Sequence, residues 1–233
     1  MRKKINKIIK NILPPIFYPS VFREIFGILV RGKDKIKYEN NFYSRHAFIN
    51  KAISKFQNCK YLEIGVNDNS VFNTIPLPIE NKFGVDPEKG GNLKMTSDEF
   101  FKINNEKFDV VFIDGLHHFE QCRNDCINSL ECLKPDGIIF IHDLLPRNFL
   151  EEKVPRVQTS WTGDIWKISE EILISKNIDF KIVNIDMGIG ILKPKKNFEY
   201  KIISGIENKK YNDFLKLYPH LPIINSKEAL LFI

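Results

Sequence analysis

The chain has 233 residues, of which 43% are hydrophobic and 27% charged, which is typical of a globular protein with one sizeable core and excludes a mainly disordered or fibrous chain. It contains no window of about 18 uncharged apolar residues, so the sequence predicts no membrane-spanning helix. The net charge of +6 arises in residues 1–37, which carry ten Lys or Arg and two Asp or Glu, whereas the rest is slightly acidic. A nucleic-acid partner is not expected, because such a protein would carry a basic stripe within its fold.

Residues 1–40 are expected to form a basic N-terminal helical segment. Four isoleucines recur at helical spacing opposite lysines, and two prolines stop that helix: Ile5, Ile8, Ile9, Ile12, Pro14 and Pro15. One interpretation is peripheral contact with anionic lipid at the inner face of a membrane. The other is a helix that packs on the protein body or on a second copy in a homo-oligomer.

Residues 41–194 alternate between helical and strand patterns. Helices are expected at 44–56, 96–102, 118–133 and 165–175, and strands at 60–64, 82–85, 108–113, 138–141, 180–185 and 188–192. Thr96 and Glu99 have the spacing of a capping box, and Pro135 and Gly137 are expected to end the third helix. Residues 195–233 form a C-terminal extension to which the pattern assigns no structure.

This alternation predicts an α/β fold, a doubly wound sheet that is mostly parallel with helices on both faces. The last two strands are too close for a crossover helix, so they should be antiparallel. Four cysteines are present without a CxxC pair, which indicates reduced, partly buried thiols in a cytoplasmic protein: Cys59, Cys122, Cys126 and Cys132.

The first motif with chemical meaning is the turn that follows the strand at 60–64. Ligands bind outside the carboxyl ends of the strands in open α/β sheets, and Gly65 would let the backbone approach one closely. Asn67 and Asn69 are residues that tolerate left-handed backbone. The full G-x-G-x-x-G pattern is absent, so the turn alone fits a cofactor loop or an ordinary connection. Asp86 ends the next strand, about 20 residues on, where a ribose diol would be bound.

Five segments, in this order and spacing, resemble a class I S-adenosylmethionine-dependent methyltransferase: LEIGVNDNS, GVDP, MTSDEFF, FDVVFIDGLHHFEQ and GIIFIHD. Within that class they are most similar to the small O-methyltransferases of sugar and polysaccharide pathways, the macrocin O-methyltransferase-like group. The resemblance covers residues 60–194 and implies a Rossmann-like sheet of about seven strands with a reversed last strand. The sequence departs from the family by having asparagine where the loop usually has later glycines.

The resemblance also implies where S-adenosylmethionine would bind. Glu63, Gly65 and Asn67 would line its methionine side, with Ser70 in the same loop. Asp86 would bind the ribose, and Ser97 with Asp98 would lie beside the adenine.

A third motif combines Asp114 and His117 after one buried strand with His142 and Asp143 after another. If the strands are neighbours, these side chains converge at one edge of the sheet. Asp114, His142 and Asp143 could hold Mg²⁺ or Mn²⁺, which would lower the pKa of an acceptor hydroxyl. Alternatively, the site is metal-free and His117 acts as general base, oriented by an acidic residue. His117 is the expected base in either case, and His118 is expected to start the following helix.

The long loop at 144–167 is expected to cover the site and bind the acceptor. Trp161 and Trp166 could stack on a sugar ring, and Arg147 or Arg156 could hold a phosphate. We therefore expect an S-adenosylmethionine-dependent O-methyltransferase that acts on a sugar hydroxyl of a surface polysaccharide or a nucleotide-linked sugar. Two rivals are a small-molecule enzyme acting on a phenol or polyketide, and a non-catalytic partner subunit with this fold.

Overall fold

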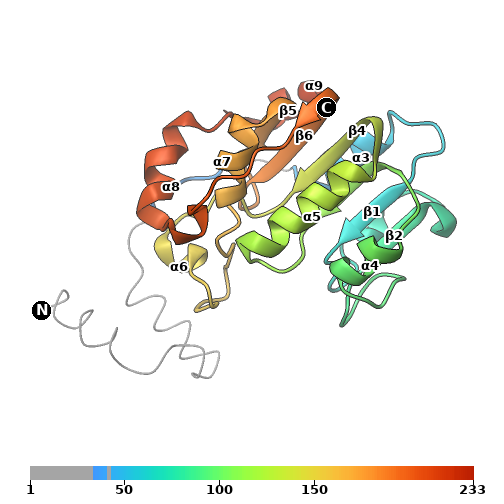
Figure 1. The fold of residues 1–233 in the computed structure, drawn as a ribbon, viewed down its shortest axis with the longest axis horizontal. Coiled ribbons are helices and arrows are strands. Elements are labelled where there is room, and N and C mark those ends of the chain that lie inside the picture. The colour runs from blue at the N-terminus through green and yellow to red at the C-terminus, as the bar shows by residue number, and fades with distance from the viewer. Residues whose placement is uncertain (1–33, 41–42) are drawn as a thin grey trace, which may run out of the picture.

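The computed structural model describes residues 34–40 and 43–233 (Figure 1). The helix predicted within residues 1–33 lies outside the described residues. The helices are α3 (Arg45–Ile53), α4 (Ser97–Ile103), α5 (Phe119–Glu131), α6 (Phe149–Glu152), α7 (Lys167–Ile174), α8 (Tyr211–Leu217) and α9 (Ser226–Phe232). The strands are β1 (Tyr61–Ile64), β2 (Lys82–Val85), β3 (Phe108–Ile113), β4 (Leu133–Ile141), β5 (Lys176–Val183), β6 (Ile189–Glu199) and β7 (Ile223–Ile224). Short 3₁₀ turns occur at Phe72–Thr74, Ile79–Asn81, Ile206–Asn208 and Tyr218–His220.

The strands form one seven-stranded sheet in the order β2-β1-β3-β4-β6-β5-β7. All neighbouring pairs are parallel except those that involve β6, which is antiparallel to both β4 and β5. The predicted doubly wound sheet with a reversed strand near the chain's end is confirmed. The reversed strand is the last but one, because the C-terminal residues add β7 at the edge beside β5.

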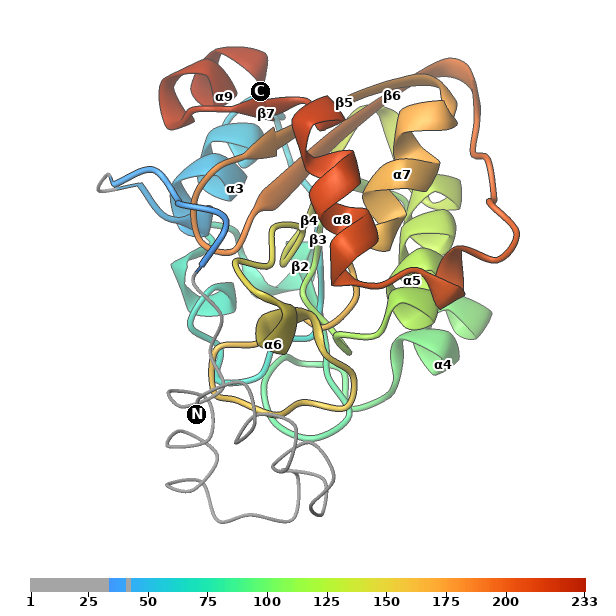
Figure 2. The same ribbon diagram turned by 90° about the vertical axis from the view of Figure 1, so that its left-hand side faces the viewer.

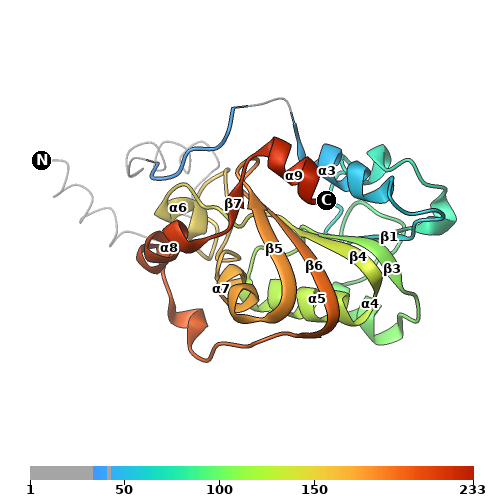
Figure 3. The ribbon, with the colours of Figure 1, turned by 90° about the horizontal axis from the view of Figure 1, so that it is seen from above.

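Helices cover both faces of the sheet. α3 and α9 lie on one face, and α4, α5 and α7 lie on the other, while α6 lies beyond one end (Figures 2 and 3). Alternate residues of the central strands pack against the two layers: Val111 and Ile113 of β3 join the core beneath α5 and α7, and Val110 and Phe112 join the core beneath α3. This two-sided burial explains why the run at 108–113 is apolar except at Asp109.

Several local predictions are confirmed. β2 and β3 have the predicted bounds, and Thr96 and Glu99 form the capping box of α4. All four cysteines are free and buried. In the part of the chain that the structure describes, no helix is both long enough and apolar enough to cross a bilayer.

Several boundaries were predicted wrongly. α3 ends at Ile53 rather than at residue 56, β5 begins at Lys176 rather than at residue 180, and β6 continues to Glu199 rather than ending at residue 192. Pro135 and Gly137 do not separate α5 from the next strand, because α5 ends at Glu131 and β4 already begins at Leu133. The pairing of β3 with β4 shifts register between Phe108 and Val110, so the proline and glycine occupy an irregular stretch of the strand where ladder bonds are not required.

Candidate functional site

A cavity of about 930 Å³ opens at the carboxyl ends of β1 to β4. Its lining includes all of the predicted cofactor-binding residues: Glu63, Gly65, Asn67, Ser70, Asp86, Ser97 and Asp98. It also includes all four predicted catalytic residues: Asp114, His117, His142 and Asp143. The sheet therefore brings together residues that lie far apart in the sequence.

The turn after β1 has the backbone that its residue types predict. Gly65 has φ +82°, and a Cβ built on it would lie 2.3 Å from the carbonyl oxygen of Asp114, so only glycine fits against the end of β3. Asn67 and Asn69 have φ 51° and 64°, which confirms the expected left-handed conformation. The Asn69 side chain accepts a hydrogen bond of 2.8 Å from the Gly91 N–H. These features make a tight turn whose backbone faces the cavity.

Asp86, at the end of β2, is 8% exposed and organises this turn. Its carboxylate accepts backbone N–H bonds from Asn67, Glu88 and Lys89, each 2.8 Å long. Burial alone would raise the pKa of Asp86, but the three N–H donors outweigh it and keep the pKa below its ordinary value. The residue therefore presents an ionised carboxylate at the cavity wall.

Glu63 is the second buried carboxyl of the wall and is only 1% exposed. The Tyr61 hydroxyl donates a 2.7 Å hydrogen bond to its Oε2. Burial raises the pKa of Glu63 to about 8, and the hydrogen bond from Tyr61 offsets only part of this effect. At neutral pH the side chain is therefore mainly protonated.

The end of the cavity near α4 contains two polar residues of α5 that the sequence reasoning missed. The Gln121 amide lies 3.1 Å from Ser97 Oγ, 3.0 Å from Asp98 Oδ1 and 3.1 Å from Asp125 Oδ1. Burial raises the pKa of Asp125 to about 6. The four-residue spacing of Gln121 and Asp125 on one helix face was the available signal.

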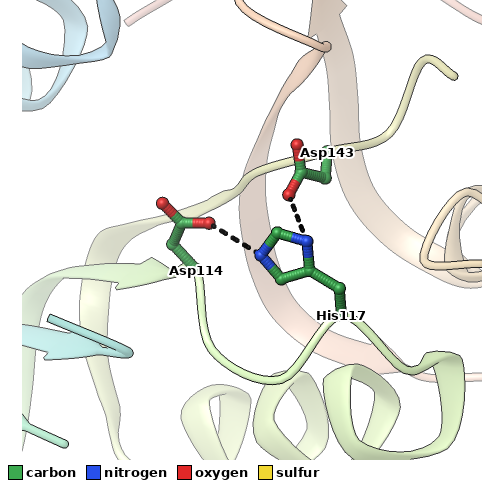
Figure 4. A group of neighbouring side chains, drawn as sticks. All are labelled: Asp114, His117 and Asp143. Carbon is green, nitrogen blue, oxygen red and sulfur yellow. Dashed lines mark ion pairs between the residues drawn. The ribbon is translucent and has the colours of Figure 1, made fainter. Parts of the chain in front are cut away.

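Asp114, His117 and Asp143 form the centre of the site (Figure 4). His117 Nδ1 lies 3.1 Å from Asp143 Oδ2 and 3.0 Å from the Trp161 carbonyl oxygen, and His117 Nε2 lies 3.7 Å from Asp114 Oδ1. A carbonyl oxygen can only accept a hydrogen bond, so this contact assigns the ring proton to Nδ1. Nε2 is then the atom of the neutral ring that can accept a proton.

Asp143 is held in an unusual conformation. Its φ is +67° and it is 1% exposed. Both of its carboxylate oxygens are buried, and neither makes a hydrogen bond of good geometry with the residues that the structure describes. Such strain in a non-glycine residue is typical of functional sites. His142 Nδ1 lies 3.1 Å from Asp143 Oδ1 and 3.2 Å from Asp114 Oδ1. Burial alone would lower the pKa of His142, but the two carboxylates raise it well above its ordinary value.

Arg45 and Asp186 complete this cluster, and no local pattern of residues predicts either role. Arg45 Nη1 donates to Asp114 Oδ2 at 2.6 Å, and its Nε and Nη2 bind Asp186 at 2.7 and 3.0 Å. Burial opposes the ionised form of Asp114, yet His142 and Arg45 keep the pKa of this carboxyl below its ordinary value. The pKa of Asp186 is likewise low, since the nearby His142 ring and the hydrogen bonds from Arg45 outweigh burial.

Three ligand atoms, one each from Asp114, His117 and Asp143, lie within 4.8 Å of one another. Two carboxylates and an imidazole suit Mg²⁺ or Mn²⁺, and the buried Asp143 oxygens have capacity to bind a cation. His142, the third predicted ligand, contacts both carboxylates through Nδ1. Asp114, however, already has a nitrogen against each of its oxygens, from Arg45 and His142.

The loop after β4 contributes Arg156, Thr159 and Trp161 to the cavity wall. The Trp161 and His117 rings stack, with centroids 4.9 Å apart and planes inclined by 20°. Gly163 has φ +62°, and a Cβ there would lie 1.8 Å from the His117 carbonyl oxygen, so the loop packs closely over the turn that contains His117.

Two predicted acceptor contacts are corrected. Trp166 is 0% exposed, packs on Phe214 and lies outside the cavity lining, because its side chain fills the core under α7 and α8. Arg147 also lies outside the lining, and its guanidinium binds Glu151 and Ser160 within the loop.

A family model described as a methyltransferase domain matches residues 88–144, a segment that contains Asp114, His117, His142 and Asp143. No curated protein matches the chain. Among solved structures, the chain is similar to an S-adenosylhomocysteine-bound methyltransferase from Podospora anserina, with 16% identity, a TM-score of 0.50, and coverage of 66% of this chain and 80% of that one.

Two further structures are an O-methyltransferase from Bacillus cereus and a putative caffeoyl-CoA O-methyltransferase from Staphylococcus aureus. The first has 12% identity and a TM-score of 0.47, and the match covers 84% of this chain and 100% of that one. The second has 13% identity and a TM-score of 0.49, and the match covers 83% and 98%. At 16% identity, the likeness to the Podospora anserina structure is evidence for the fold alone, a Rossmann-like methyltransferase fold. The methyltransferase-domain match is confined to residues 88–144.

Proposed function

We propose, from the premise that the chain carries a methyltransferase domain, that it transfers the methyl group of S-adenosylmethionine to a hydroxyl oxygen of a sugar. The observation that carries this proposal is the single cavity whose wall combines the Glu63–Asp86 side with the Asp114–His117–Asp143 group. Methyl transfer requires a donor and an acceptor to be aligned in one water-poor site, and it needs no covalent nucleophile.

The cofactor would lie along the turn after β1. S-adenosylmethionine supplies an electrophilic methyl group on a sulfonium centre. The Asp86 carboxylate is suited to accept hydrogen bonds from the ribose hydroxyls, since it is ionised and fixed by three backbone N–H groups. Gly65 leaves the turn backbone accessible, and Gln121 with Asp98 offers polar groups for the adenine at the other end.

His117 would act as the general base. With the ring proton on Nδ1, donated to the Trp161 carbonyl oxygen beside Asp143, Nε2 accepts the proton of the acceptor hydroxyl. The acceptor oxygen forms the new O–C bond as the S–C bond breaks, and the proton remains on His117. Asp143 and Asp114 stabilise the resulting imidazolium, because they lie on opposite sides of the ring.

A sugar is the acceptor class that the wall chemistry favours. Trp161 presents an aromatic ring at the cavity, and the polar groups around it suit a molecule rich in hydroxyls. Arg156, whose guanidinium lies 5.8 Å from the Trp161 ring centroid, is placed to bind an anionic group such as the phosphate of a nucleotide-linked sugar.

The test is methyl transfer by the full chain to nucleotide-linked hexoses, with catechol as the phenolic alternative. We expect turnover of a sugar, and His117→Ala should lower kcat by about 10²- to 10⁴-fold while S-adenosylhomocysteine still binds. His118→Ala is the matched control, because His118 precedes α5 without a side-chain capping bond and does not line the cavity. Turnover of catechol alone would show that the acceptor is a small phenol rather than a sugar. An unchanged kcat in His117→Ala would show that His117 is not the general base.

A further inference from the structure

Arg45 reaches the catalytic carboxylates from a helix that the mechanism above does not use. It is the first residue of α3, on the face of the sheet opposite α5 (Figure 3). Its guanidinium joins Asp114, at the end of β3, to Asp186, in the turn between β5 and β6. All three side chains line the cavity.

The guanidinium is fixed in one orientation. Two of its nitrogens bind the two oxygens of Asp186, at 2.7 and 3.0 Å, which is the bidentate geometry that only arginine offers. Asp186 is itself held at φ 45° in a tight turn. The third nitrogen is thereby directed at Asp114 Oδ2, 2.6 Å away.

Arg45 neutralises part of a cluster of negative charge. Asp114, Asp143 and Asp186 bring three carboxylates to one end of the sheet, and proteins commonly neutralise such a cluster with a divalent cation. Here a permanent cation of the chain itself already occupies the cluster. A metal ion bound to Asp114 would have to share that carboxylate with a guanidinium, and the two positive charges would repel each other at short range.

We infer that Arg45 supplies the positive charge that a divalent cation would otherwise supply at Asp114, so that the active site works without a metal ion. Arg45 is a positioning residue, because it acts on His117 through Asp114. The catalytic part of this inference rests on the proposed methyl transfer, whereas its metal-binding part does not.

The test is a titration of the full-length protein with Mn²⁺, followed by electron paramagnetic resonance. The wild type should show no stoichiometric Mn²⁺ binding at about 1 mM, and Arg45→Ala should bind one ion at least about tenfold more tightly. That new site should disappear in the double variant Arg45→Ala/Asp114→Asn. Arg45→Lys retains a positive charge but loses the bidentate pair with Asp186, so it should bind Mn²⁺ more weakly than Arg45→Ala does.

Arg123→Ala is the matched control for losing a paired arginine, since Arg123 makes a bidentate pair with the buried Glu171 away from the cavity. It should gain no Mn²⁺ site. Circular dichroism checks folding, and Arg45→Gln replaces Arg45→Ala if the alanine variant does not fold. Stoichiometric, Asp114-dependent Mn²⁺ binding by the wild type, or no gain in the folded Arg45 variants, would overturn the inference.

A second measurement concerns turnover. Wild-type methyl transfer should be unchanged by EDTA, and loss of activity that added Mg²⁺ restores would also overturn the inference. Absence of turnover on every acceptor would instead count against the proposed function, and the Mn²⁺ titration would still decide the role of Arg45.

Discussion

The buried carboxyl of Glu63 gives the most quantitative prediction, through the variant Glu63→Gln. The side chain is 1% exposed, and burial raises its pKa from the ordinary 4.5 to about 8. Glutamine has the same shape as the protonated carboxyl, and its carbonyl can accept the hydrogen bond from the Tyr61 hydroxyl. The substitution therefore imitates the neutral form and removes the ionised one.

The direction in which stability changes with pH follows from proton binding. Between about pH 4.5 and pH 8 the folded protein retains a proton at Glu63 that the unfolded chain releases, so rising pH lowers wild-type stability. The stabilising effect of the raised pKa is complete below about pH 4.5 and is lost as the pH passes 8. The difference between the ordinary pKa and the pKa in the folded protein corresponds to about 5 kcal/mol of unfolding free energy, at 1.36 kcal/mol for each pKa unit.

Urea unfolding of both proteins at two pH values is the assay. Glu63→Gln should match the wild type to within about 1 kcal/mol at pH 5 and exceed it by up to about 5 kcal/mol at pH 9. Glu80→Gln, at an exposed position, is the control and should show the same difference from the wild type at both pH values. A free-energy difference for Glu63→Gln that does not grow with pH would refute the reasoning.

Two further predictions concern the turn and the loop that form the cavity. Gly65→Ala should destabilise the fold by more than about 2 kcal/mol in urea unfolding, through left-handed strain and a clash with the Asp114 carbonyl. Gly205 also has a left-handed backbone, at φ +80°, but no described atom lies within 4 Å of a Cβ built on it. Gly205→Ala should therefore cost only about 1 kcal/mol. Equal costs at both glycines would contradict the close packing of the turn on β3. Trp161→Ala should raise the acceptor KM about tenfold or more while the affinity for S-adenosylhomocysteine is unchanged, and Trp161→Phe should restore much of the acceptor binding. A KM that does not change would exclude Trp161 from the acceptor site.

Local chemistry predicted part of the structure from the sequence. The strand at 108–113 could be recognised because its apolar run requires cover on both faces. The start of α4 could be recognised because the side chains of Thr96 and Glu99 each accept a hydrogen bond from the other's backbone N–H. The left-handed residues of the turn were predictable from the tolerance of asparagine for that conformation. These signals act over a few residues and need no knowledge of the fold.

The parts that sequence reasoning missed depend on contacts between distant segments. Arg45 meets Asp114 and Asp186 across 69 and 141 residues of sequence, so no local pattern could join them. The two tryptophans of the loop look alike in the sequence, yet one lines the cavity and the other fills the core. Which side of a loop faces a cavity is decided by packing, which only the structure reveals.

Binding of S-adenosylhomocysteine, measured by titration calorimetry on the wild type and on Asp86→Ala, tests the central claim most directly. The wild type should bind with a Kd in the micromolar range, and loss of charge-assisted hydrogen bonds to the ribose should weaken binding by at least about 100-fold. Asp213→Ala, at a half-buried aspartate of α8 outside the cavity, should leave the affinity unchanged. A folded wild type that does not bind, or an Asp86→Ala variant that binds equally well, would contradict the account.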